Sequence, residues 1–385
     1  MSADRRIHLV IYGVAFTLAL VAIPLLSVVG VQALLDSRDG EVIDPVLDPL
    51  EPGYQALVSP SPTLAVVHLD PDGALVGAAV LALAGEDDAA AGGSVVLLPP
   101  TTAVDLPELG TLPLDYVQAF NGSDATKALM ERALGLGIDS VVEVRDADWA
   151  DMVEPLDGLS IQNPDDLAAP DGGRFAPGPL TLEPDEVGAY LAALDVGENP
   201  RNRLLRQELV WSAYLDALGL DPDAVAFPGE QDQGLALFLP VVASGQHRVA
   251  QIPLIGDGLP GEADEPILFE PDEELVAELI PELVPFPAGA RPGDRPLVRL
   301  LDGSGRSELL TDAVSRVAVA GGQVVIIGNA DNFDVTETEI RYAEPDYEPI
   351  AVAVAEQLGV GNVVKIDHID DNAELIVVLG ADYSG

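Results

Sequence analysis

The longest apolar stretch of the chain lies near its N-terminus, where residues 9–35 contain no charged side chain. At ~1.5 Å per residue, a helix of this length crosses a ~30 Å hydrocarbon core with some tilt. Arg5 and Arg6 precede it and acidic sequence follows, which favours a cytoplasmic N-terminus. We therefore expect residues 1–8 to be a cytoplasmic tail and residues 9–35 a transmembrane anchor. The alternative is a cleaved signal peptide, whose apolar core would be shorter, roughly 7–15 residues.

Beyond the apolar stretch, the pattern changes to short elements separated by turns. Residues 36–60 are rich in Pro and Asp, which predicts a stalk with a candidate strand at its end. Residues 63–83 hold two apolar runs around the sequence DPDG, typical of a β-hairpin. A buried strand is predicted at 94–100. In residues 123–138 apolar positions recur three and four apart, which indicates a helix capped by Ser123.

Strands and helices continue to alternate further along the chain. Residues 139–146 are predicted to be a strand, and residues 180–195 a short helix with an acidic first turn. Trp149 and Trp211 lie on predicted helix faces and are expected in the core. The alternation predicts an α/β layered domain over residues 61–286, called the central region below.

The last part of the chain repeats one pattern twice. Residues 287–294, PAGARPGD, are predicted to be a linker. In residues 295–385, the C-terminal region, a strand, a helix and a strand follow one another two times. This predicts a small α/β domain of two βαβ-like halves with its own core. The predicted fold class is therefore α/β behind one N-terminal transmembrane helix.

Charge narrows the possible partners. The chain has 385 residues and 48% hydrophobic residues, enough for a sizeable core, but 65 Asp and Glu face only 18 Lys and Arg. The net charge of -47 repels nucleic acid and suits a protein outside the cytosol. Without a basic helix or patch, a nucleic-acid-binding regulator is not expected. The absence of cysteine excludes disulfides and thiol catalysis.

The scarce positive charge gathers at one helix start. Asn199 is a good N-cap, and a helix is predicted over residues 200–217. Arg203 and Arg206 are three residues apart, so they share a face, and Gln207 joins it. A helix N-terminus with two guanidinium groups and an amide can hold phosphate or pyrophosphate. These three residues are the candidate pyrophosphate-binding residues.

A structural interpretation of the same cluster competes with this one. Glu198 and Glu208 lie beside the arginines, and ion pairs between such residues are common and weakly stabilising. Arg201 projects to another side of the helix. The sequence alone favours ion pairing over anion binding.

No metal site is predicted. No two of His68, His247 and His368 have the spacing of a zinc site, and His68 is expected to be a packed or exposed strand residue. The acidic stretches 146–151 and 262–265 are interpreted as solvated faces rather than cation sites.

Several segments, in their order and spacing, resemble the LytR-CpsA-Psr (LCP) family. The resemblance covers most of residues 60–385, and its final part is similar to the LytR C-terminal domain. No single motif decides it. The segments are SVVLLPPTTAVDLPELG (94–110), ALGLGIDSVVEVRDADWADMVEPLDGLSI (133–161), GPLTLEPDEVGAYLAALD (178–195), NRLLRQELVWSAYL (202–215) and the stretch from VRLLDGSG (298–305) to VVLGADY (377–383).

The resemblance implies a transferase that moves a glycopolymer from a polyprenyl pyrophosphate carrier to a peptidoglycan hydroxyl. In the family, a pocket holds the lipid, and arginines and acidic residues with Mg²⁺ hold the pyrophosphate. This chain departs from the pattern at three places where family arginines would stand, namely residues 61–63, 100–101 and 191–194. Of the later signature Arg203 remains, with Arg206 and Gln207.

These departures predict a membrane-anchored, extracytoplasmic LCP-like protein that is catalytically degenerate. It would be a single-pass protein with most of the chain outside the cytoplasm. Expected partners are the membrane, a cell-wall glycopolymer or polyprenyl-linked lipid, and other proteins, but no nucleic acid. The alternative is an active phosphotransferase that uses Mg²⁺ and a relocated cation such as Arg145 or Arg174.

Overall fold

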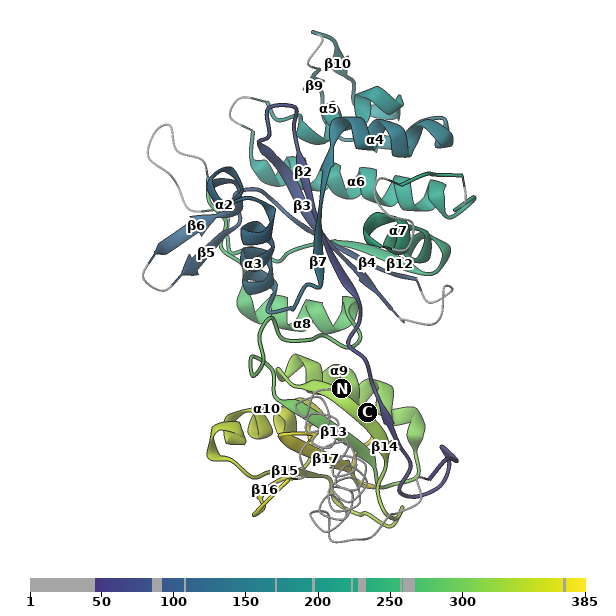
Figure 1. Ribbon diagram of the computed structural model, residues 1–385, viewed down its shortest axis with the longest axis vertical. Coiled ribbons are helices and arrows are strands. Elements are labelled where there is room, and N and C mark those ends of the chain that lie inside the picture. The colour runs from purple at the N-terminus through teal and green to yellow at the C-terminus, as the bar shows by residue number, and fades with distance from the viewer. Residues whose placement is uncertain are drawn as a thin grey trace, which may run out of the picture. The chain divides into compact units, whose positions relative to one another are not determined.

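The computed structural model describes most of the chain beyond residue 45 (Figure 1). The predicted tail (1–8) and anchor helix (9–35) lie outside the described residues. Within the described part, no helix is both long and apolar enough to span a bilayer. Residues 49–385 belong to one compact unit. The described residues are 46–84, 92–106, 109–169, 172–195, 198–222, 224–227, 233–256, 258, 267–369 and 372–385.

A mixed sheet of five strands forms the middle of the central region. Its strands are β2 (Thr63–Leu69), β3 (Leu75–Leu83), β4 (Gly93–Leu98), β7 (Ser140–Arg145) and β12 (His247–Gln251). The strand order is β12-β4-β3-β2-β7, and the predicted hairpin of antiparallel β2 and β3 is confirmed. Every residue of β2 and β3 is buried. Because successive side chains point to opposite faces, both faces of this sheet must be covered.

Helices cover both faces, which gives three layers. On one face Leu64 and Val66 of β2 pack in a core with four helices. These are α4 (Asp146–Val153), α5 (Val187–Ala192), α6 (Pro200–Leu218) and α7 (Gly234–Ser244). On the other face Ala65 and Val67 pack in a second core with three helices. These are α2 (Leu114–Asn121), α3 (Ser123–Leu134) and α8 (Glu273–Leu283).

The predicted layered α/β architecture is confirmed, and Trp149 and Trp211 are core residues as expected, with 1% and 6% exposure. Six short strands lie outside the main sheet in three antiparallel pairs, β5–β6, β8–β11 and β9–β10. They are β5 (Ala103–Leu106), β6 (Gly110–Pro113), β8 (Leu159–Asn163), β9 (Leu167–Ala168), β10 (Arg174–Phe175) and β11 (Gly178–Leu182).

Two local predictions were wrong. The helix predicted over 180–195 begins later, because residues 178–182 alternate in burial and pair with β8, and only Val187–Ala192 is α-helical. The cap predicted at Ser123 lies one residue earlier, at Gly122, whose φ of 78° suits glycine best. The hydroxyl of Ser123 instead donates to Glu143 at 2.6 Å.

The C-terminal region builds a second sheet. Its own strands are β13 (Leu297–Asp302), β14 (Gln323–Asn329), β15 (Glu339–Tyr342), β16 (Asn362–Lys365) and β17 (Leu375–Leu379). Its helices are α9 (Leu310–Val319) and α10 (Glu348–Leu358). The parallel pairs β13–β14 and β15–β16 each enclose one helix in sequence, so the two predicted βαβ halves are confirmed. Strand β17 lies between them.

The sixth strand of this sheet comes from the predicted stalk. Strand β1 (Gln55–Leu57) pairs antiparallel with β14 at the sheet edge, opposite Ile326–Gly328. A Cβ on Gly328 would lie 2.0 Å from the carbonyl oxygen of Tyr54, so the close approach requires glycine. The side-chain amide of Asn329 donates to the carbonyls of Pro49 and Glu51 at 2.9 and 2.7 Å. Part of the stalk is therefore a component of the second sheet, whereas the predicted domain boundaries stay predictions.

Candidate functional site

The predicted helix after Asn199 is confirmed as α6. The side chain of Asn199 accepts a hydrogen bond from the backbone N–H of Arg201 at 3.0 Å, and Pro200 is the first helical residue. This cap places three arginines on the first two turns of the helix. Their environments differ: Arg206 is buried, whereas Arg201 and Arg203 are half-buried.

Arg206 is fully buried and its charge is compensated inside the protein. Its Nη1 donates to Glu198 Oε1 at 2.6 Å and to Asp165 Oδ2 at 2.8 Å, and its Nη2 donates to the carbonyl of Ala193 at 2.7 Å. Burial is the largest single influence on Glu198 and raises its pKa, but the hydrogen bonds from Arg206, the Asp195 backbone and Asn202, together with the charge of Arg206, outweigh it, so the pKa is lowered. Arg206 therefore fixes the segment after α5 rather than presenting a free cation.

Gln207 is also occupied by the fold. It is 4% exposed, and its Nε2 donates to the carbonyls of Val76 and Leu191, both at 3.2 Å. A Cβ on Gly77 would approach this amide nitrogen to 2.8 Å, so the glycine makes room for it. The side chain links strand β3 to helix α5 across the core.

Arg203 has a different environment. It is half-buried, and within the described part of the chain it forms no hydrogen bond and no ion pair. Burial and the nearby charge of Arg206 lower its pKa, whereas Asp115 and Glu198 oppose this shift. Burial also raises the pKa of Asp115. The common open face predicted for Arg203, Arg206 and Gln207 is therefore absent, because the last two point into the protein. Their role in pyrophosphate binding stays a prediction.

The ion-pair interpretation, in which Glu198 and Glu208 pair with the arginines, is confirmed for one of these two residues. Glu198 does pair with an arginine, Arg206, but Glu208 accepts from Gln251 Nε2 at 2.6 Å instead. Arg201 projects elsewhere, as predicted. Its Nη2 donates to the carbonyl of Leu254, and its guanidinium lies 5.2 Å from the ring centre of Phe269.

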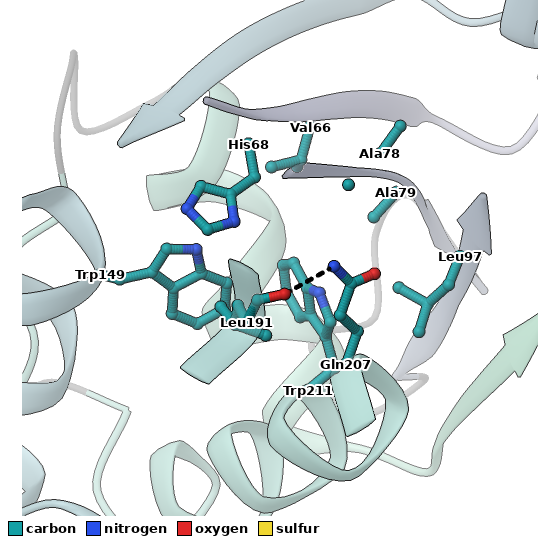
Figure 2. Close-up of a pocket in the computed structure, with 10 residues that line it drawn as sticks. Val66, His68, Ala78, Ala79, Leu97, Trp149, Leu191, Gln207 and Trp211 are labelled. Carbon is teal, nitrogen blue, oxygen red and sulfur yellow. Dashed lines mark hydrogen bonds between the residues drawn. The ribbon is translucent and has the colours of Figure 1, made fainter. Parts of the chain in front are cut away.

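A small cavity lies between the central sheet and helices α4, α5 and α6 (Figure 2). It offers about 20 Å³ to the centre of a water-sized sphere. Since one water needs roughly 10–15 Å³ by this measure, the cavity has room for about one water. The indoles of Trp149 and Trp211 fill the adjoining space, with ring centres 5.1 Å apart.

One polar pair borders this cavity. His68 is 6% exposed, and its Nε2 lies 3.0 Å from Asp146 Oδ1, which ties β2 to the first residue of α4. His68 is thus packed, one of the two outcomes expected from the sequence. The indole Nε1 of Trp149 is buried without a hydrogen-bond partner in the described structure. Sequence reasoning missed this His–Asp pair, although a histidine within an apolar strand is a signal that could have found it.

The positions where family arginines would stand hold neutral side chains. Ser61 and Thr101 are buried, at 8% and 6% exposure, and Leu191 is buried at 1%. The proposed substitutes are engaged with carboxylates. Arg145 lies 3.7 Å from Glu143, and Arg174 donates to Asp166 at 2.7 Å. Among the described residues, no three acidic or histidine side chains come together to hold a metal ion.

Comparison with known families assigns the end of the chain. Residues 296–383 match the family model described as "LytR cell envelope-related transcriptional attenuator". These residues form a LytR C-terminal domain. The prediction of this domain is confirmed, and β13 to β17 with α9 and α10 are its elements. No curated protein shows a significant match to the chain.

Solved structures similar to the chain include LCP proteins, the family that the sequence resembles. "TagT bound to LIIa-WTA" is 19% identical, covers 63% of this chain and 93% of its own, with a TM-score of 0.47. "LytR-CPS2A-psr family protein YwtF (TagT) with bound octaprenyl pyrophosphate lipid" is 18% identical, with coverages of 63% and 92% and a TM-score of 0.45. "Crystal structure of B. subtilis TagT" is 19% identical, with coverages of 63% and 93% and a TM-score of 0.46. A "LytR-Csp2A-Psr enzyme from Actinomyces oris" is 16% identical, with coverages of 58% and 92% and a TM-score of 0.44.

Proposed function

We propose that this chain is a membrane-anchored, extracytoplasmic LCP-like protein that serves cell-envelope glycopolymer assembly by binding rather than by transfer. The C-terminal match to a cell envelope-related family supports the process. The apolar stretch 9–35 supports the anchor, and the excess of acidic residues supports a location outside the cytoplasm.

The observation that carries the binding role is the unequal state of the retained arginines. Arg206 is neutralised by Glu198 and Asp165, so Arg203 is the retained arginine with no hydrogen-bond partner among the described residues. A pyrophosphate carries two to three negative charges, and transfer chemistry depends on cations that neutralise them. One guanidinium can bind such an anion but neutralises only one of its two to three negative charges.

The core beside α6 supports the same proposal. The family resemblance implies a pocket for a polyprenyl chain, yet the cavity at Trp149 and Trp211 has room for about one water. A lipid-linked ligand would therefore be held at its polar end near Arg203, with its hydrocarbon chain outside this core.

Binding of octaprenyl pyrophosphate to the full chain in detergent micelles tests the proposal. We expect saturable binding of wild type and a loss of about 10- to 100-fold in Arg203→Ala, because a charge-assisted hydrogen bond contributes roughly 1.5–3 kcal/mol. The matched control is Arg248→Ala, which removes an exposed arginine paired with Glu282 on another element. Equal binding by Arg203→Ala and wild type would contradict the role of Arg203.

The alternative, an active phosphotransferase, rests on the juxtaposition of Arg203 and Asp115. A free cation next to a carboxylate with a raised pKa could hold pyrophosphate together with Mg²⁺. The test is release of polymer from a polyprenyl pyrophosphate-linked substrate with and without Mg²⁺. We expect no turnover in either condition. Mg²⁺-dependent release that is lost in Arg203→Ala, and in Arg145→Ala or Arg174→Ala, would favour the enzyme.

A further inference from the structure

Two aromatic side chains break the burial pattern of this protein. Phe120 is 72% exposed and Tyr116 is 49% exposed, whereas every other aromatic side chain among the described residues is buried or half-buried. Both lie on α2, one turn apart, and their ring centres are 4.6 Å from each other at an angle of 41°. Two exposed aromatic rings packed together form a candidate binding surface.

The packing of α2 does not require these rings. Leu114 and Val117 are the α2 residues that enter the core under the sheet, at 0% and 6% exposure. Tyr116 and Phe120 lie on the outer side of the same helix. Neither ring belongs to the core under the sheet.

Polar residues flank the aromatic pair in the sequence. Asp115 precedes Tyr116 and is half-buried, Asn121 follows Phe120 and is exposed, and Asp124 at the start of α3 is exposed as well. These side chains offer carboxylate acceptors and one amide that both donates and accepts. The nearby cation is Arg203, which interacts electrostatically with Asp115.

This combination selects the class of ligand. A sugar ring has a face of C–H groups, which the electron-rich face of an aromatic ring attracts, and a rim of hydroxyls that can donate to carboxylates. A phosphate-rich or anionic lipid surface would be repelled by the acidic residues. A stable protein partner needs roughly 800 Å² per side, whereas two aromatic side chains supply at most about 150–250 Å² each. The patch fits one or two sugar units.

We propose that Tyr116 and Phe120 form a saccharide platform that holds a neutral sugar unit of a glycopolymer next to Arg203. The choice of a glycopolymer as the natural ligand rests on the proposed function, but the platform itself depends only on the aromatic pair and its polar neighbours. Sugar binding and pyrophosphate binding then use adjacent but separate side chains.

The test titrates the full chain in detergent micelles with two neutral soluble glycans, chitotetraose and maltoheptaose, by calorimetry. We expect wild type to bind at least one of them and Tyr116→Ala/Phe120→Ala to lose about tenfold or more in affinity. Phe120→Trp, which keeps a stacking face, should retain binding. Leu237→Ala, a truncation of an exposed side chain on α7, is the matched control and should bind as wild type does.

Two results would contradict the saccharide platform. One is that wild type binds neither glycan, and the other is that Tyr116→Ala/Phe120→Ala binds a glycan as tightly as wild type does. Binding to phosphatidylcholine vesicles that the double variant loses, without glycan binding, would assign the patch to a membrane instead. If octaprenyl pyrophosphate does not bind but the glycan does, the proposed function fails and the platform stands.

Discussion

At the scale of single residues, the fate of Arg206 shows how an acidic protein uses its few cations. Helix spacing predicts that Arg203 and Arg206 share a face, but it does not predict which part of that face turns inward. The structure places Arg206 at 0% exposure between Glu198 and Asp165. Asp165 is 41 residues away in sequence, so no local pattern indicates it. Sequence reasoning therefore located the arginines but not their state.

Glu198→Gln should reduce the stability of the protein at pH 7 by about 1–3 kcal/mol, because it weakens a charge-assisted pair to a buried guanidinium. The folded-state pKa of Glu198 is lowered below its ordinary 4.5. Its contribution is thus present above pH 4.5 and is lost as the pH falls through the folded-state value. Urea unfolding of wild type and variant between pH 7 and pH 3 measures this difference.

The difference in the free energy of unfolding between wild type and Glu198→Gln should become smaller as the pH falls. Glu282→Gln is the control, since Glu282 pairs with Arg248 where both side chains are about half exposed. A difference in stability that stays constant from pH 7 to pH 3 would contradict the stabilising role of the ionised Glu198 carboxylate.

At the scale of secondary structure, local periodicity predicted the elements that local interactions determine. The hairpin of β2 and β3, helix α6 with its Asn199 cap, and both βαβ halves of the LytR C-terminal domain were predicted correctly. The stalk strand β1 was predicted only as a candidate, and its partner β14 could not be, because more than 260 residues separate Leu57 from Ile326. Long-range pairing leaves no periodic signal in either segment.

The docking of β1 gives a prediction at this scale. Asn329→Ala removes the two hydrogen bonds that the buried side chain of Asn329 donates to the carbonyls of Pro49 and Glu51. We expect a loss of about 1–3 kcal/mol and faster amide hydrogen exchange over residues 53–58. Asn362→Ala is the control. Asn362 is exposed, donates to Glu337, and lies on β16, the edge strand on the other side of the sheet from β1. Unchanged exchange in Asn329→Ala would show that the backbone pairing alone holds β1.

At the scale of the whole molecule, the net charge of -47 dominates. With 65 acidic and 18 basic residues, most carboxylates have no cation to pair with, so the folded state experiences self-repulsion. Salt screens such repulsion over a Debye length of about 10 Å at 0.1 M and about 3 Å at 1 M.

The melting temperature of the protein should therefore rise with sodium chloride between about 0.02 and 1 M, by several degrees. Differential scanning calorimetry measures it. An equal rise in a nonionic osmolyte of the same osmolality, with no additional effect of salt, would indicate that charge screening is not the cause.

The stalk strand β1 also affects how the LytR C-terminal domain could be transferred to another protein by gene fusion. The LytR C-terminal domain matches its family as one continuous segment, residues 296–383, yet its sheet takes an edge strand from residues 55–57. A gene fusion that moved only the matching segment to another protein would carry a sheet with an open edge at β14, shaped by Gly328 to accept a strand. The recipient would have to supply that strand. In this chain the two segments form one sheet, although the central region lies between them in the sequence.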